Sequence, residues 1–166
     1  MEAQTARLAY GEEAEQSLLR WVLAQTEPLL TQPGARELLL AALPIGSATR
    51  GKVEQALDRG DLERALWVAD LWSGAGYDLL GLEKSAEGQL EVVRYECKGL
   101  AAGTGRIRVF LSRRELAIAR KVHQEGPGRW LLVGVEPTGR SINLTPLLAD
   151  LLVESALPLE PLFDRG

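Results

Sequence analysis

Two short segments, eighteen residues apart, hold the residue types of this chain that are best suited to chemistry. Gly76-Tyr77-Asp78 supplies one carboxylate, and Tyr95-Glu96-Cys97-Lys98-Gly99 supplies a second carboxylate and a lysine. Two neighbouring carboxylates repel each other unless a proton or a cation lies between them. Mg²⁺ prefers oxygen ligands and keeps several waters, and a lysine beside it can orient a water or contact a phosphate. These residues predict a metal-dependent site for phosphodiester hydrolysis.

The expected strand geometry brings these residues together. Residues two apart in a strand share a face, so Glu96 and Lys98 are expected to point the same way, together with Arg94. An antiparallel hairpin that turns near Gly88 places Asp78 opposite residues 96–98. The hairpin register therefore predicts a cluster of two carboxylates and one lysine.

The elements expected to position this cluster define the fold class. The sequence predicts an α/β fold with a mixed central sheet flanked by helices and a helical N-terminal layer. Ser112 and Glu115 form a capping box that starts a helix running to about residue 123. The other expected helices are 11–26, 35–43, a polar helix from 47 or 49 to about 60, and 145–154; the expected strands are 65–72, 77–83, 89–97, 106–111 and 129–136, and the tail is expected to be irregular.

Composition limits the possible classes of protein. The chain has 166 residues, 46% of them hydrophobic, which is enough for one domain with a sizeable core. We divide it into a helical layer (1–61), a motif-bearing α/β core (62–136) and a C-terminal helix and tail (137–166). No apolar run of about 18 residues predicts a membrane span, and a single cysteine suits a reducing cytoplasm. One cysteine and one histidine, His123, cannot form a His/Cys zinc site within the chain.

The charge is unevenly distributed. The net charge is −4, but the segment from Lys98 to Lys121 holds seven basic residues against one acid, a local balance of +6. A local positive field attracts polyanions whatever the total charge, which predicts nucleic-acid contacts along this segment. The alternative is a solvated helix face with a few arginines at a strand edge. The residues expected to contact nucleic acid are Arg106, Arg108, Arg113 and Arg114.

The order of motifs resembles a known family. Gly76-Tyr77-Asp78, Tyr95-Glu96-Cys97-Lys98-Gly99, the segment 110–116 (Phe-Leu-Ser-Arg-Arg-Glu-Leu) and the segment 129–133 (Arg-Trp-Leu-Leu-Val) resemble the NO VEIN C-terminal-type domain. That family is placed in the PD-(D/E)XK, restriction-endonuclease-like superfamily and is often encoded beside helicase and defence genes. The resemblance covers residues 65–135, and a Glu15-containing segment is similar to the family's first helix. The segment 26–61 is long for the family.

The resemblance implies roles for individual residues. Asp78 and Glu96 would be metal ligands for Mg²⁺ or Mn²⁺ and Lys98 the catalytic lysine; Glu15 would be a third acidic ligand, the backbone carbonyl of Cys97 another ligand, and Glu115 an accessory residue. Without the family, Glu15 is explained as a helix-start acid on a solvated face, and Glu115 by its capping box. The expected function is Mg²⁺-dependent DNA cleavage in restriction, defence or DNA processing. The alternatives are an inactive nuclease-fold module that binds nucleic acid, a protein partner or a second copy, and an RNA-processing nuclease.

Overall fold

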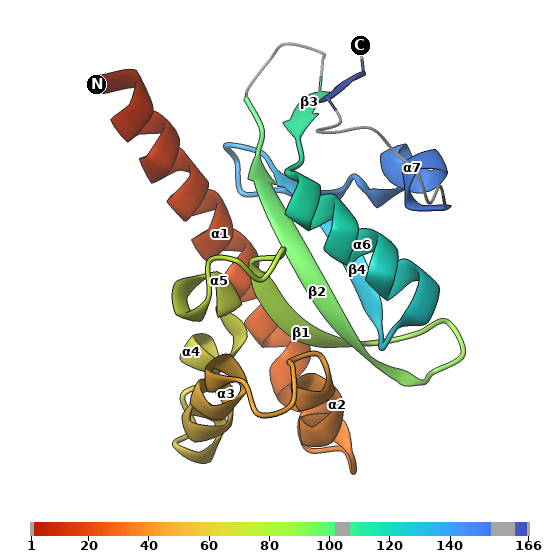
Figure 1. Ribbon diagram of the computed structural model, residues 1–166. Helices are drawn as coiled ribbons and strands as arrows, with labels where there is room; N and C mark the ends of the chain where they lie inside the picture. The colour runs from red at the N-terminus through yellow and green to blue at the C-terminus, as the bar shows by residue number, and fades with distance from the viewer. Residues whose placement is uncertain (1, 102–106, 154–161, 166) are drawn as a thin grey trace.

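A four-stranded mixed sheet forms the centre of the fold (Figure 1). The computed structural model describes residues 2–101, 107–153 and 162–165. The strands lie in the order β1-β2-β4-β5, where β1 is Leu79–Lys84, β2 is Leu90–Gly99, β4 is Arg129–Val135 and β5 is Ser141–Asn143. β1 and β2 are antiparallel, β2 and β4 are parallel, and β4 and β5 are antiparallel. The predicted mixed sheet flanked by helices is confirmed.

Helices cover the two faces of this sheet. Helix α1 (Glu2–Leu29) packs against β1 and β2, and its Trp21 ring lies 6.3 Å from the ring of Tyr95 in an edge-to-face arrangement. Helix α6 (Arg113–Glu125) connects β2 with its parallel neighbour β4, and its Glu115 contacts Lys98 from the other face. Since Tyr95 and Lys98 are three residues apart on β2, they point to opposite faces. α1 and α6 therefore lie on opposite sides of β2 (Figure 1).

Four further helices make up the N-terminal layer. They are α2 (Ala35–Ala41), α3 (Ala48–Asp58), α4 (Leu62–Leu66) and α5 (Val68–Leu71). Ser47 caps α3, because its hydroxyl accepts a hydrogen bond from Arg50 N at 3.2 Å. The helices expected near residues 11–26, 35–43 and 47–60 are confirmed, although α1 is longer than expected.

The strand predicted over residues 65–72 is wrong, because this segment forms the end of α4 and all of α5. Asp61 caps α4 by accepting a hydrogen bond from Arg64 N at 3.2 Å. Ala65, Leu66 and Val68 are fully buried in the core. A short apolar run fits a buried strand and a buried helix equally well, so the local pattern did not distinguish the two.

The C-terminal part also differs from expectation. The segment 145–154 forms a 3₁₀ turn (Thr145–Leu148) followed by α7 (Ala149–Val153). β3 (Ile107–Phe110) pairs antiparallel with β6 (Leu162–Arg165) in a separate two-stranded sheet. The expectation of an irregular tail is therefore wrong for residues 162–165, while Pro158 and Pro161 lie outside the described residues. Within residues 2–101, 107–153 and 162–165, no helix is long and apolar enough to span a membrane.

Candidate carboxylate–lysine site

Asp78 is held by the backbone at the point where the chain enters β1. Its N–H donates to Tyr95 O at 2.8 Å, and its carbonyl oxygen accepts from Ala69 N at 2.9 Å. Its carboxylate Oδ2 accepts a hydrogen bond from Cys97 N at 2.8 Å. The strand register pairs Leu79 with Tyr95, and extending it by one residue places Asp78 opposite Glu96. The predicted juxtaposition of Asp78 with residues 96–98 is present in the structure.

Glu96 is a buried acid whose carboxyl group faces that of Asp78. It is only 5% exposed, and its carboxyl group lies close enough to that of Asp78 for the two to share a proton. Burial raises the pKa of Glu96 well above its ordinary value, and the nearby charge of Asp78 raises it further. Burial also raises the pKa of Asp78, against the hydrogen bond from Cys97 N, which lowers it. The pair therefore favours a state with a shared proton or an added cation.

Lys98 joins this pair to helix α6. Its Nζ lies 3.3 Å from Glu96 Oε2 and 3.1 Å from Glu115 Oε1. Burial alone lowers the pKa of Lys98, but the charges of Glu96 and Glu115 outweigh this effect, so its pKa is raised and the ammonium stays charged. The expectation that Glu96 and Lys98 share a face of β2 agrees with these contacts.

Glu115 has two roles in the structure. Its backbone N–H donates to Ser112 Oγ at 3.0 Å, and its Oε1 accepts from Ser112 N at 3.1 Å. This reciprocal pair is the capping box that the sequence predicts. The same Oε1 accepts the hydrogen bond from Lys98, so the start of α6 also fixes the lysine beside the carboxylates. The capping pattern predicts the first role and says nothing of the second.

Two other predicted ligand residues lie near the cluster. Glu15 on α1 is partly buried; burial raises its pKa, and the charge of Asp78 raises it further. Its Oε1 accepts a hydrogen bond from Trp67 Nε1 at 3.2 Å. Cys97 is buried, and burial raises the pKa of its thiol, which keeps it protonated. Sequence reasoning missed Trp67 because it assigned this residue to a strand, and no short-range pattern links it to Glu15, 52 positions earlier.

The predicted basic contacts are only partly described. Arg113 and Arg114 are exposed in the first turn of α6. The Arg114 side chain donates to Gly74 O, and its guanidinium lies 5.6 Å from the centre of the Trp72 ring. Arg106 and the side chain of Arg108 lie outside the described part of the chain. Among the described residues, Arg113 is therefore the predicted contact that is exposed and whose side chain has no hydrogen bond or ion pair.

The donor set fits Mg²⁺ only in part. Two carboxylates and several waters suffice for this ion in many sites, and the raised pKa values of Asp78 and Glu96 indicate a place where added positive charge is favourable. However, the described residues contain no group of three or more His, Cys, Asp or Glu side chains arranged to hold a metal ion. A metal held here would therefore depend on Asp78, Glu96 and water.

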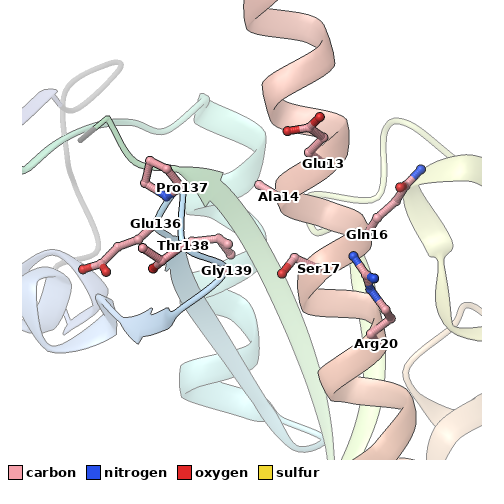
Figure 2. Close-up of a pocket in the computed structure, with 10 residues that line it drawn as sticks. Glu13, Ala14, Gln16, Ser17, Arg20, Glu136, Pro137, Thr138 and Gly139 are labelled. Carbon is pink, nitrogen blue, oxygen red and sulfur yellow. The ribbon is translucent and has the colours of Figure 1, made fainter.

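A separate cavity of about 460 Å³ lies between α1 and the turn that joins β4 to β5 (Figure 2). Ser17 of α1 faces Gly139 of the turn in this view. None of Asp78, Glu96 and Lys98 lines the cavity.

Comparison of the chain with protein-family models, with curated proteins and with solved structures found no match. The function must therefore be argued from the residues themselves.

Proposed function

We propose that this protein is a metal-dependent nuclease of the PD-(D/E)XK, restriction-endonuclease-like type, which hydrolyses DNA phosphodiester bonds in restriction, defence or DNA processing. The observation that carries the proposal is that the carboxyl groups of Asp78 and Glu96 face each other, with the Lys98 ammonium 3.3 Å from Glu96 Oε2. Titratable groups with perturbed pKa values that face one another are more frequent at functional sites than elsewhere. The order of the sequence motifs supports the same class.

Each residue has a defined task in this proposal. Asp78 and Glu96 would hold Mg²⁺ or Mn²⁺, which supplies positive charge to a phosphoryl oxygen and lowers the pKa of a bound water. Lys98 keeps its proton and donates hydrogen bonds to the scissile phosphate or to the attacking water. Glu115 orients the lysine from the start of α6. Glu15 and the backbone carbonyl of Cys97 are further candidate ligands.

DNA is proposed as the substrate because basic side chains lie close to this cluster. Arg113 follows the Ser112 cap of the helix whose Glu115 contacts Lys98. Lys and Arg side chains bind the phosphate backbone without reading its sequence. An RNA substrate would use the same contacts, and only the substrate assay below distinguishes the two.

Cleavage assays test the proposal directly. Purified protein is incubated with supercoiled DNA, single-stranded DNA and RNA in Mg²⁺, Mn²⁺ or EDTA. We expect cleavage of DNA only with a divalent ion, and its loss in the Asp78→Asn, Glu96→Gln and Lys98→Met variants. Glu63→Gln, which changes an exposed acid on α4, is the matched control and should remain active.

Two results would redirect the proposal. Preferential cleavage of RNA with the same variant profile would assign the site to an RNA-processing nuclease. Absence of cleavage of every substrate, together with DNA binding that Arg113→Gln weakens, would favour an inactive binding module. Cleavage that persists in all three site variants would refute the assignment of the site.

A further inference from the structure

A second cavity, of about 270 Å³, lies on the α6 side of the sheet, next to the carboxylate–lysine cluster but lined by other residues. The end of α2, helix α6 and the loop at residues 126–127 surround it. Its walls are largely apolar and include Leu43, Trp72 and Ile118, while its polar side chains are those of Tyr77, Arg94 and Lys121. No acidic residue lines it within the described part of the chain. The cavity is therefore apolar with a positively charged end.

Arg94 supplies a buried positive charge to this cavity. Its side chain is 6% exposed, its Nη1 donates to Pro127 O at 2.7 Å, and its Nη2 donates to Ala42 O at 3.2 Å. A guanidinium has five N–H donors, so these two bonds leave donor capacity unused. Among the residues that the structure describes, no carboxylate forms an ion pair with Arg94. Buried charges are normally paired, which makes a missing counter-charge informative.

Tyr77 adds a second polar group to the same cavity. It is 5% exposed, and its buried hydroxyl forms no hydrogen bond of normal geometry within the described residues, although the Arg94 guanidinium lies close enough to interact with its oxygen. The Arg94 guanidinium lies 5.8 Å from the centre of its ring. An ordinary tyrosine hydroxyl is uncharged at neutral pH, so this hydroxyl is available as a donor. A phenolate therefore does not neutralise Arg94.

We propose that this cavity binds a small organic anion, with a carboxylate or phosphate head group on Arg94 and Tyr77 and an apolar body against Leu43, Trp72 and Ile118. An oxyanion would neutralise the buried guanidinium and accept the proton of the Tyr77 hydroxyl. Lys121, which is exposed on α6 at the edge of the cavity, would attract the anion on approach. The inference does not depend on the proposed nuclease activity.

Titration with four defined anions tests this site. Phenyl phosphate and benzoate carry a head group and an apolar ring, whereas inorganic phosphate and acetate carry the head group alone. We expect saturable calorimetric binding of at least one ring-bearing anion, at least tenfold tighter than its head group alone. The tighter of phenyl phosphate and benzoate identifies the preferred head group.

Variants assign the binding to the named residues. Tyr77→Phe keeps the ring and removes only the hydroxyl, and we expect it to weaken binding by about tenfold or more, because hydrogen bonds to charged groups are worth about 1.5–3 kcal/mol. Arg94→Gln removes the charge and should abolish measurable binding. Asp78→Asn should bind as the native protein does, which separates this site from the carboxylate–lysine cluster. Lys52→Gln, an exposed lysine on α3, is the matched control for Lys121→Gln, which should weaken binding only at low salt.

The proposal is wrong if none of the four anions binds saturably. It is also wrong if Tyr77→Phe, which changes no packed carbon atom, leaves the affinity of a bound anion unchanged. Equal binding of inorganic phosphate and phenyl phosphate would contradict the apolar half of the site.

Discussion

Replacing Lys98 with methionine tests how the carboxylate–lysine cluster is balanced. Methionine keeps a long apolar side chain of similar reach and removes the ammonium group. Glu96, whose side chain is 6% exposed, then loses the cation 3.3 Å from its Oε2, and Glu115 loses the one 3.1 Å from its Oε1. The variant therefore leaves a buried carboxyl pair with no adjacent cation, and it should reduce the free energy of unfolding.

The size of this effect follows from the burial of the partners. Removing one member of a buried ion pair costs about 3–5 kcal/mol. Two features reduce the cost here: the Lys98 side chain is 25% exposed, and the facing carboxyl groups of Asp78 and Glu96 can share a proton in place of the lost cation. We expect a loss of about 2–3 kcal/mol at pH 8, which lowers the melting temperature of a chain of this size by about 4–12 °C.

The loss should depend on pH in a defined direction. The pKa of Glu96 is raised by burial and by Asp78, so above the ordinary pKa of a glutamate the folded state holds more protons than the unfolded state. Stability then falls as pH rises toward the folded pKa. Lys98 is the cation that opposes this rise in pKa, so its removal extends the decline in stability to higher pH. The stability deficit of Lys98→Met should therefore be larger at pH 8 than at pH 5. The raised pKa of Lys98 itself matters only at alkaline pH, where the stability it contributes is lost as pH rises through that pKa.

Urea denaturation at pH 5 and pH 8 measures these quantities. Lys52→Met, an exposed lysine-to-methionine change on α3, is the control and should alter stability by less than about 0.5 kcal/mol. The double variant Lys98→Met with Glu96→Gln should recover most of the loss, because a neutral amide needs no cation. A deficit that is equal at both pH values, or strictly additive effects in the double variant, would refute the view of a coupled buried cluster.

Three other changes test the metal site, the nucleic-acid contact and the packing of the loop at Gly128. Asp78→Asn should abolish any rise in melting temperature caused by Mg²⁺ or Mn²⁺. In the native protein, metal at 100 times its Kd should raise the free energy of unfolding by about 2.7 kcal/mol. An unchanged metal effect in the variant would exclude Asp78 as a ligand. Arg113→Gln should weaken DNA binding and reduce the slope of log affinity against log salt by about 1, whereas Arg59→Gln, an exposed arginine after α3, should leave the slope unchanged. Gly128→Ala and Gly88→Ala both place alanine at a positive φ, but only at Gly128 would the new Cβ overlap the backbone of β2. Calorimetric melting should show that Gly88→Ala lowers the free energy of unfolding by about 1 kcal/mol and that Gly128→Ala lowers it clearly more. Similar losses for the two variants would contradict the close packing of the loop at Gly128.

The cluster was predictable because its geometry depends on short-range rules. A hairpin that turns near Gly88 must place Asp78 near residues 96–98, and the observed register puts it opposite Glu96. The capping box between Ser112 and Glu115 is likewise a local pattern, and it forms as expected. What local patterns do not contain is the approach of α6 to β2, which brings Glu115 to Lys98.

The errors lie where tertiary contacts decide the conformation. Residues 65–72 are apolar enough for a strand, yet the Asp61 cap and the hydrogen bond of Trp67 to Glu15 on α1 stabilise short helices. Residues 162–165 form a strand because β3 offers them unpaired backbone groups from a segment more than fifty positions earlier. A pattern within one short window carries no information about either partner.

The energetics of the cluster favour function over stability as the reason for its composition. A buried ion pair is often no more stabilising than apolar side chains of similar volume. Here the raised pKa values of Asp78 and Glu96 mean that neutral pH lowers the stability of the fold. Three apolar residues at these positions would avoid that cost and still fill the space between β2 and α6. Retaining two facing carboxyls and a charged lysine at a cost in stability is typical of sites that bind or react, and it is the physical ground on which the nuclease proposal rests.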